Sequence, residues 1–133
     1  MSYINIKVSS DKQNYNTFEE KIRLTHNGLT GNLKCYTGEQ GEFWVSLIPS
    51  LNVSGYGQTE EDSIKDLHIN VTTLCDDLFQ IDEVQRKIEL SKLGWVANKF
   101  FRKIFSKTYV DENGVLQNFD HPEKVKKSIL EAA

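Results

Sequence analysis

The first half of the chain carries patterns that are typical of β-strands joined by tight turns. Apolar residues alternate with polar ones over 1–8, which predicts a short half-buried strand. The pair Asn27-Gly28 favours a type I′ turn, because both residues tolerate positive φ. We therefore expect a hairpin formed by the segments 21–26 and 29–36.

Two further strands are predicted before residue 58. A turn at 38–41 leads into a strand over 42–48. Pro49 lacks the backbone N–H that an interior strand position needs, so this strand should end there. The segment 51–57 is short, tolerates β structure and follows the proline directly. The first half is therefore predicted to be a meander of antiparallel strands.

The pattern becomes helical at Thr59. Thr59 is a good N-cap, Asp62 takes the third helical position, and the acids of this first turn favour the positive end of the helix dipole. Apolar residues then recur at helical spacing and form one stripe, which comprises Ile64, Leu67, Val71, Leu74 and Leu78. Asp82 can cap a second helix over 83–93, and Gly94 can end it in the left-handed conformation.

The last third carries a weaker pattern. A second Asn-Gly pair, at 113–114, predicts a hairpin between 107–110 and 115–119. Pro122 suits the first turn of a helix, and we predict a final helix over 123–131. The predicted fold class is α+β: an antiparallel β-meander packed by a long amphipathic helix, with an extra C-terminal hairpin and helix.

Length and composition narrow the class of protein. The chain has 133 residues, enough for one hydrophobic core, and we expect a single domain over 1–133. Its 38% hydrophobic and 26% charged residues are ordinary for a water-soluble protein. No apolar run is long enough for a membrane span, and the first residues do not resemble a signal peptide, so we expect a cytoplasmic protein without membrane contact. Cys35 and Cys75 are expected to be free thiols.

Four steps follow one another between the second strand of the meander and the long helix. They are an aromatic-containing strand at 43–45, a Pro-x-Leu step at 49–51, a short strand at 53–56 and a Gly-x-Thr-x-Glu helix entry at 57–61. Members of the HicB antitoxin family typically show these steps in this order. Roughly residues 30–80 therefore resemble that family.

The resemblance implies both a fold and a role. The fold would be a partial RNase-H-like α/β sandwich with a core of about 20–80 and a C-terminal extension of about 81–133. The role would be that of a non-catalytic protein-binding module without a cofactor, either an antitoxin that neutralises a small toxin ribonuclease or an orphan relative. We expect partner binding at Phe43, Trp44 and Tyr56. We also expect a homo-oligomer, because extra elements of this size often cover a sheet edge or build a subunit contact.

An alternative function is suggested by the charge distribution. The net charge is −3, yet the segment 92–107 contains five basic residues, no acid and several aromatic rings. A nucleic-acid-binding module could use this segment for phosphate contacts and stacking, with the candidate residues Trp95, Lys99, Arg102, Lys103 and Lys107. The competing interpretation is that Trp95 and the phenylalanines pack in the core while the cations reach solvent.

Candidate catalytic and metal-binding residues are few. His26, His68 and His121 are far apart in sequence and show no ligand spacing. Cys75 lies beside Leu74 on the long helix and is better explained by packing than by catalysis. The pair Asp76-Asp77 is adjacent on a helix, where successive side chains point about 100° apart. We therefore expect no metal site and no enzymatic activity.

Overall fold

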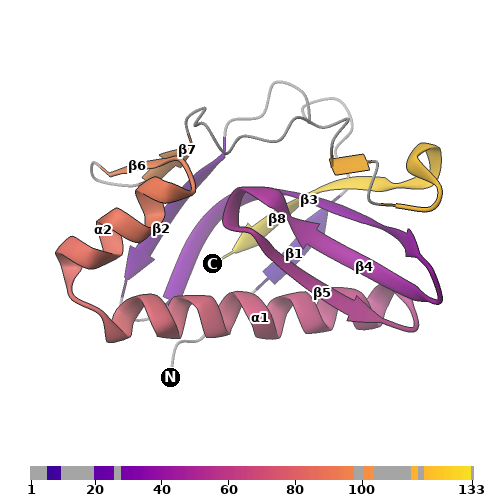
Figure 1. Ribbon diagram of the computed structural model, residues 1–133, viewed down its shortest axis with the longest axis horizontal. Helices are drawn as coiled ribbons and strands as arrows, with labels where there is room; N and C mark the ends of the chain where they lie inside the picture. Colours follow the sequence, from indigo (N-terminus) through magenta and orange to yellow (C-terminus); the bar gives the residue numbers. More distant parts are fainter. Residues whose placement is uncertain are drawn as a thin grey trace.

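The computed structural model describes residues 6–9, 20–25, 28–97, 101–103, 115–116 and 119–132. Within these residues the fold is α+β, with one antiparallel sheet and two α-helices, as the sequence predicts (Figure 1). The strands are β1 (Ile6–Ser9), β2 (Lys21–Thr25), β3 (Gly28–Gln40), β4 (Phe43–Ile48), β5 (Val53–Gly57), β6 (Trp95–Ala97), β7 (Phe101–Lys103) and β8 (Lys126–Ala132). The helices are α1 (Glu60–Gln80) and α2 (Glu83–Lys92), with short 3-10 turns η1 (Pro49–Leu51) and η2 (Pro122–Lys124). None of the described helices is long and apolar enough to cross a membrane.

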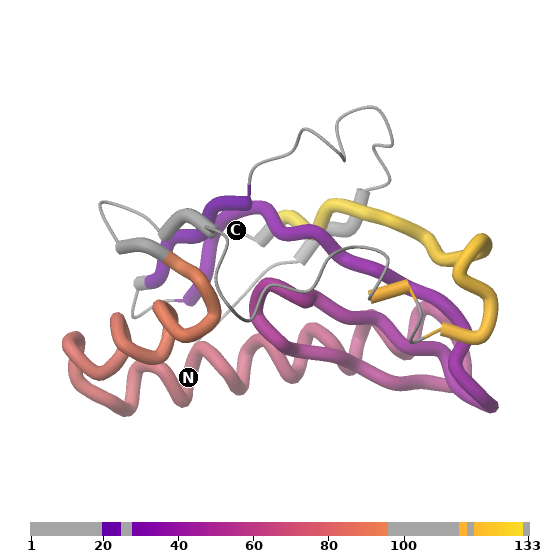
Figure 2. Tube along the Cα trace, turned by 45° about the horizontal axis from the view of Figure 1, so that its top comes forward, coloured from indigo at the N-terminus to yellow at the C-terminus, as the bar shows by residue number. Residues whose placement is uncertain are grey.

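The long strand β3 organises the sheet. One edge of β3 pairs with β8 over residues 31–37. The other edge pairs first with β2 and then, beyond a gap, with β4. The sheet therefore forks at the middle of β3 into a β2-β7-β6 arm and a β4-β5 arm. Figure 2 shows β8 running beside β3, although β3 belongs to the first third of the chain and β8 to its last residues.

Local signals explain where most elements begin and end. The Thr59 hydroxyl accepts a hydrogen bond from the Asp62 N–H at 3.1 Å, which caps α1 as predicted. The Asp82 carboxylate accepts one from the Gln85 N–H at 2.7 Å and caps α2. Gly94 follows α2 at φ 92, where a side chain would be strained. These signals act within a few residues, so the sequence alone identifies them.

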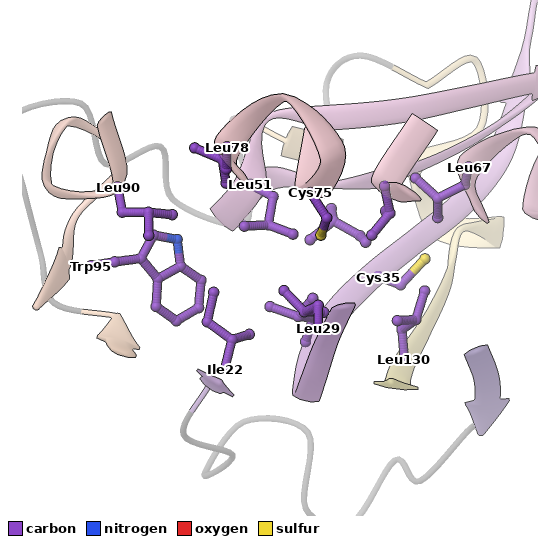
Figure 3. Close-up of a cluster of buried hydrophobic side chains, with 13 residues drawn as sticks. Ile22, Leu29, Cys35, Leu51, Leu67, Cys75, Leu78, Leu90, Trp95 and Leu130 are labelled. Atoms are coloured by element: carbon purple, nitrogen blue, oxygen red, sulfur yellow. The ribbon is translucent and has the colours of Figure 1, made fainter. Parts of the chain in front are cut away.

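The main core lies between the sheet and α1. Leu67, Val71 and Cys75 of α1 are almost fully buried against residues of β2, β3 and β8. Figure 3 shows the Trp95 indole of β6 beside Leu90 of α2, at one end of this core. Four residues of the predicted stripe, Leu67, Val71, Leu74 and Leu78, therefore lie in this core or against it, whereas Ile64 does not belong to it.

A second cluster lies on the opposite face of the sheet. It contains Tyr36, Val45, Val115, Phe119 and Ile129, all at most 7% exposed. Because apolar side chains are buried on both faces of the sheet, apolar and polar residues do not alternate cleanly along every one of the strands β3, β4 and β8.

Helix α1 approaches the sheet unusually closely at β5. A Cβ atom added to Gly55 would lie 2.2 Å from the Leu67 nitrogen and 2.4 Å from the Ser63 oxygen. These distances are shorter than any van der Waals contact, so only glycine fits between β5 and the helix backbone.

A chain of buried hydroxyl groups joins the sheet to the first turn of α1. The Ser63 hydroxyl donates to the Glu60 carbonyl oxygen at 2.6 Å, so its oxygen is left to accept from Ser46 at 2.7 Å. Ser46 then accepts from Thr37 at 2.8 Å. Because each hydroxyl has a single proton, the direction of all three bonds is fixed, and no member is left without a partner.

Two predictions for the C-terminal part are wrong. The predicted helix over 123–131 is the turn η2 followed by strand β8. The predicted strand over 115–119 is helical at Val115 and Leu116, while its partner segment 107–110 lies outside the described residues. Because β8 lies between β1 and β3, the C-terminal part completes the sheet and is not an addition to a finished core.

Candidate functional site

The two exposed aromatic residues of the β4-β5 hairpin lie on one face of the sheet. Val45 and Tyr56 are directly paired, and Phe43 precedes Val45 by two residues, so the side chains of all three point to the same face. Phe43 is 50% exposed and Tyr56 is 54% exposed. We call these two residues the aromatic rim. They occupy diagonal positions on neighbouring strands, about 7–8 Å apart at the backbone.

Trp44, the third predicted partner-binding residue, belongs to the other face. Successive residues of a strand alternate between faces, and Ser46 contacts Ser63 of α1. Trp44 therefore points to the same face as α1, and it is half-buried. The structure thus brings together Phe43 and Tyr56 and separates Trp44 from them.

The aromatic rim continues the second hydrophobic cluster out to the protein surface. The segment that covers this face contains Val115, Leu116 and Phe119, and we call it the covering segment. Val45 of the second cluster lies between the rim and the covering segment. Phe119 of the covering segment packs directly on β3, where its Cδ1 atom would lie only 2.8 Å from a Cβ added to Gly38. The rim therefore lies at the uncovered margin of this apolar face.

Asp120 fixes the covering segment beside the rim. Its carboxylate accepts a hydrogen bond from the Gly41 N–H at 2.7 Å, and its own N–H donates to the Glu39 carbonyl at 2.9 Å. His121 lies 3.8 Å from the Glu39 carboxylate. The turn between β3 and β4 is therefore tied to a segment that is about 80 residues away in sequence.

The end of the molecule that carries the rim is acidic. The β3-β4 turn, the end of β5, the start of α1 and η2 all lie at this end (Figure 1). The stretches 39–43, 56–62 and 119–126 contain two lysines and the acids Glu39, Glu42, Glu60, Glu61, Asp62, Asp120 and Glu123. Lys126 is paired with Glu60 at 2.8 Å. A negative potential therefore surrounds the two exposed rings.

Polar side chains of α1 occupy the outer edge of β5. The Tyr56 N–H donates to the Asp66 carboxylate at 2.9 Å, and the Asn70 side chain donates to the Ser54 carbonyl at 2.7 Å. Both groups point away from β4, toward the position of a further strand. Sequence analysis did not single out Asp66 and Asn70, because their i,i+4 spacing shows a shared helix face but not what that face meets.

The residues proposed for nucleic-acid binding are only partly within the described chain. Trp95 is 1% exposed, and its indole N–H donates to the Ser50 carbonyl at 3.0 Å. The packing interpretation therefore holds for Trp95, since a ring buried in this way is not available to a base. Arg102 and Lys103 lie in β7, whereas Lys99 and Lys107 are outside the described residues.

The two thiols are poor candidates for catalysis. Burial raises the pKa of Cys35 to about 11 and that of Cys75 to about 12. Both thiols are therefore protonated at neutral pH, whereas a nucleophilic cysteine acts as the thiolate. Both are free, as expected from the sequence.

The other candidate ligands are dispersed. His68 is half-buried on α1, Asp76 is half-buried and Asp77 is exposed, while His26 lies outside the described residues. In the part of the chain that the structure describes, no three His, Cys, Asp or Glu side chains are grouped as a metal site would require.

No family model matches the chain, and no curated protein or solved structure matches it either. We therefore base the proposed function on the geometry of the described residues and on the sequence resemblance of residues 30–80.

Proposed function

We propose that the chain is a non-catalytic, HicB-like protein-binding module whose partner is a small basic protein. The observation that carries the proposal is the aromatic rim, in which Phe43 and Tyr56 are half-exposed on one apolar face. Exposed aromatic rings that lie together on one face mark a candidate interface, because aromatic residues are among those that contribute most to protein interfaces.

The surroundings of the rim suit a protein partner. Aromatic side chains have only two rotatable torsions, so these rings lose little conformational freedom on binding, which favours affinity. The acids around them would attract a basic partner and orient it before contact. Basic side chains at the margin and an apolar group against the rings would give the usual arrangement of a polar periphery around an apolar centre.

The arrangement of β3, β4, β5 and α1 supports the HicB-like part of the proposal. These elements form a three-stranded antiparallel meander with a helix across it, which is the unit that the resemblance implies. In this role the module would bind a small toxin ribonuclease and block its activity.

Two further expectations belong to this proposal. We place the protein in the cytoplasm, where free thiols such as Cys35 and Cys75 stay reduced. We also propose a homo-oligomer, in which the subunit contact leaves the aromatic rim free for the partner.

The test is capture of the partner and its reconstitution with purified proteins. The tagged chain would retain a small basic protein from an extract of its native host. Calorimetry of the two purified proteins would then compare the wild type with Phe43→Ser/Tyr56→Ser. We expect the rim variant to bind at least about 30-fold more weakly, as is typical when two central aromatic residues are removed.

A matched control removes two apolar side chains that are at least as exposed as the rim residues but lie elsewhere. Ile69 is 62% exposed and Val84 is 70% exposed, both on helices. The variant Ile69→Ser/Val84→Ser should bind within about twofold of the wild type, because such isolated surface residues contribute little. Unchanged affinity of the rim variant, or the absence of any small basic protein in the captured material, would refute the proposal.

A further inference from the structure

Two carboxylates lie beside the aromatic rim, one near each end. The Asp66 carboxylate accepts a hydrogen bond from the backbone N–H of Tyr56 at 2.9 Å, so it lies at the edge of β5 beside the residue that carries one ring. The Asp120 carboxylate accepts a hydrogen bond from the Gly41 N–H at 2.7 Å, two residues before Phe43. Because backbone hydrogen bonds hold both carboxylates, their negative charge is fixed at the margin of the rim.

These two carboxylates are not neutralised by a neighbouring cation. At the same end of the molecule, Glu60 is paired with Lys126 at 2.8 Å. Within the ranges that the structure describes, no lysine, arginine or histidine forms an ion pair with Asp66 or Asp120. The same is true of Glu42, which directly precedes Phe43. A positive charge placed at the rim would therefore meet carboxylates that have no other counter-ion.

The two rings of the rim are available to a ligand as well. Phe43 and Tyr56 are half-exposed, and among the described side chains neither ring is stacked on another ring or covered by a cation. The face of an aromatic ring carries partial negative charge and attracts cations. The rings and the nearby carboxylates thus favour the same kind of group.

The protein already contains a guanidinium bound in this way. The Arg86 side chain lies over the Phe79 ring, with its central carbon 4.1 Å from the ring centroid. The same group donates hydrogen bonds to the carbonyl oxygens of Leu78 and Ile81 at 2.8 Å and 3.1 Å. An arginine can therefore stack on a ring and donate to oxygens at the edge of that ring at the same time, whereas a lysine ammonium is a compact point charge.

We propose that the aromatic rim binds arginine side chains of its partner, with a guanidinium stacked on Phe43 or Tyr56 and hydrogen-bonded to a carboxylate beside the rim. This inference rests on the proposed function, because it takes the rim as the site of the partner. Arginine has both properties expected of the bound group, since its methylene stem is apolar and its guanidinium pairs with carboxylates. An apolar side chain alone would leave the charges of Asp66 and Asp120 uncompensated.

The test uses the full chain and two fluorescently labelled peptides of equal charge, hexa-arginine and hexalysine. Fluorescence anisotropy would measure both affinities at about 150 mM salt, because exposed charges more than about 8 Å apart are largely screened there. We expect hexa-arginine to bind at least about threefold more tightly than hexalysine. Attraction by net charge alone predicts equal affinities.

A variant without a change in charge tests the rings. Phe43→Leu/Tyr56→Leu keeps two apolar side chains and removes both aromatic faces. Each exposed contact between a cation and a ring contributes a factor of about 2–5, so this variant should bind hexa-arginine about 5- to 25-fold more weakly than the wild type. Simple apolar contact would leave its affinity within about twofold.

A second variant tests the carboxylate at the edge of β5. Asp66→Asn keeps an oxygen that can accept the Tyr56 N–H and removes the negative charge. It should bind hexa-arginine at least about threefold more weakly. The matched control Asp77→Asn makes the same change at an exposed position about 16 Å farther along α1, and it should change the affinity by less than about 1.5-fold.

The arginine proposal is overturned if the wild type does not bind hexa-arginine or binds hexalysine equally well. It is also overturned if the leucine variant stays within about twofold, or if Asp77→Asn loses as much affinity as Asp66→Asn. The proposed function is judged separately, by the captured partner and Phe43→Ser/Tyr56→Ser. A partner whose binding is weakened by the serine variant but not by the leucine variant would support the proposed function and overturn the arginine proposal.

Discussion

Close contact between α1 and β5 depends on a single residue, Gly55. The variant Gly55→Ala would place a Cβ atom 2.2 Å from the backbone nitrogen of Leu67. Backbone atoms cannot rotate aside, so the helix must move away from the sheet and disturb the hydroxyl chain beneath its first turn. We expect a loss of at least about 3 kcal/mol in the free energy of unfolding, measured by urea denaturation.

Gly41 provides the control for this prediction. It has φ 61 and would place an added Cβ in open space. The variant Gly41→Ala should therefore lose only about 1 kcal/mol, the usual cost of a left-handed alanine. If Gly55→Ala were no more destabilising than Gly41→Ala, the close approach of α1 to β5 would be wrong.

The candidate binding residues also show what single positions reveal in a sequence. Phe43, Trp44 and Tyr56 are equally conspicuous as aromatic residues. Phe43 and Trp44 are successive residues of one strand, so strand alternation alone already places their side chains on opposite faces. The side on which Tyr56 lies depends instead on the pairing of β4 with β5, which the sequence does not specify and which the structure shows as Val45 opposite Tyr56.

At the scale of elements, α1 both packs on the sheet and protects one of its edges. Asp66 and Asn70 occupy hydrogen-bonding groups of β5 that would otherwise pair with another strand. The variant Asp66→Ala/Asn70→Ala should expose that edge and increase self-association as concentration rises. Size-exclusion chromatography with light scattering would detect the change in mass.

The control is a second i,i+4 pair on the same helix. Thr73 and Asp77 are exposed and have no contact with β5 among the described hydrogen bonds. Thr73→Ala/Asp77→Ala should leave the mass unchanged at every concentration. Equal masses for both variants would show that Asp66 and Asn70 do not protect the edge.

Elements with local signals were predictable, and elements without them were not. The hairpin of β2 and β3, the stop at Pro49 and the caps of both helices depend on signals within a few residues, and the structure agrees with each. The register pairs Thr25 with Gly28, so Gly28 belongs to β3 and not to the centre of the turn as predicted. The strand β8 has no such signal. Its sequence of lysine, serine, leucine and glutamate is compatible with a helix, and its strand form is stabilised by pairing with β1 and β3.

Burial on both sides also hides β8 from pattern analysis. Ile129 packs in the second cluster and Leu130 in the main core, so two successive residues are buried. A half-buried strand would alternate, whereas this one does not. The period of two that identified β1 is therefore absent where the sheet has two covered faces.

At the scale of the whole molecule, the structure predicts that no short piece folds alone. A fragment spanning 20–80 contains the meander and α1 but lacks Leu90, Trp95 and Leu130, which complete the main core. It also exposes the edge of β3 that β8 covers. We expect the fragment to show no cooperative thermal transition by circular dichroism, while the full chain unfolds in one step.

A point variant in β8 of the full chain tests what β8 contributes to the core without shortening the protein. Leu130 is fully buried, and Leu130→Ala should destabilise the protein by about 2–5 kcal/mol while keeping the cooperative transition. Cooperative melting of the 20–80 fragment would contradict this view and would identify an independent core.

The position of β8 also determines when the sheet can be completed during protein synthesis. At about 5–20 residues per second, the interval between the synthesis of β3 and that of β8 lasts roughly 5–20 s. During this interval Leu33 of β3 lacks its strand partner Leu130. The nascent chain therefore passes through a stage in which the long strand β3 has an open edge on the ribosome. At this stage binding by a chaperone would compete with aggregation.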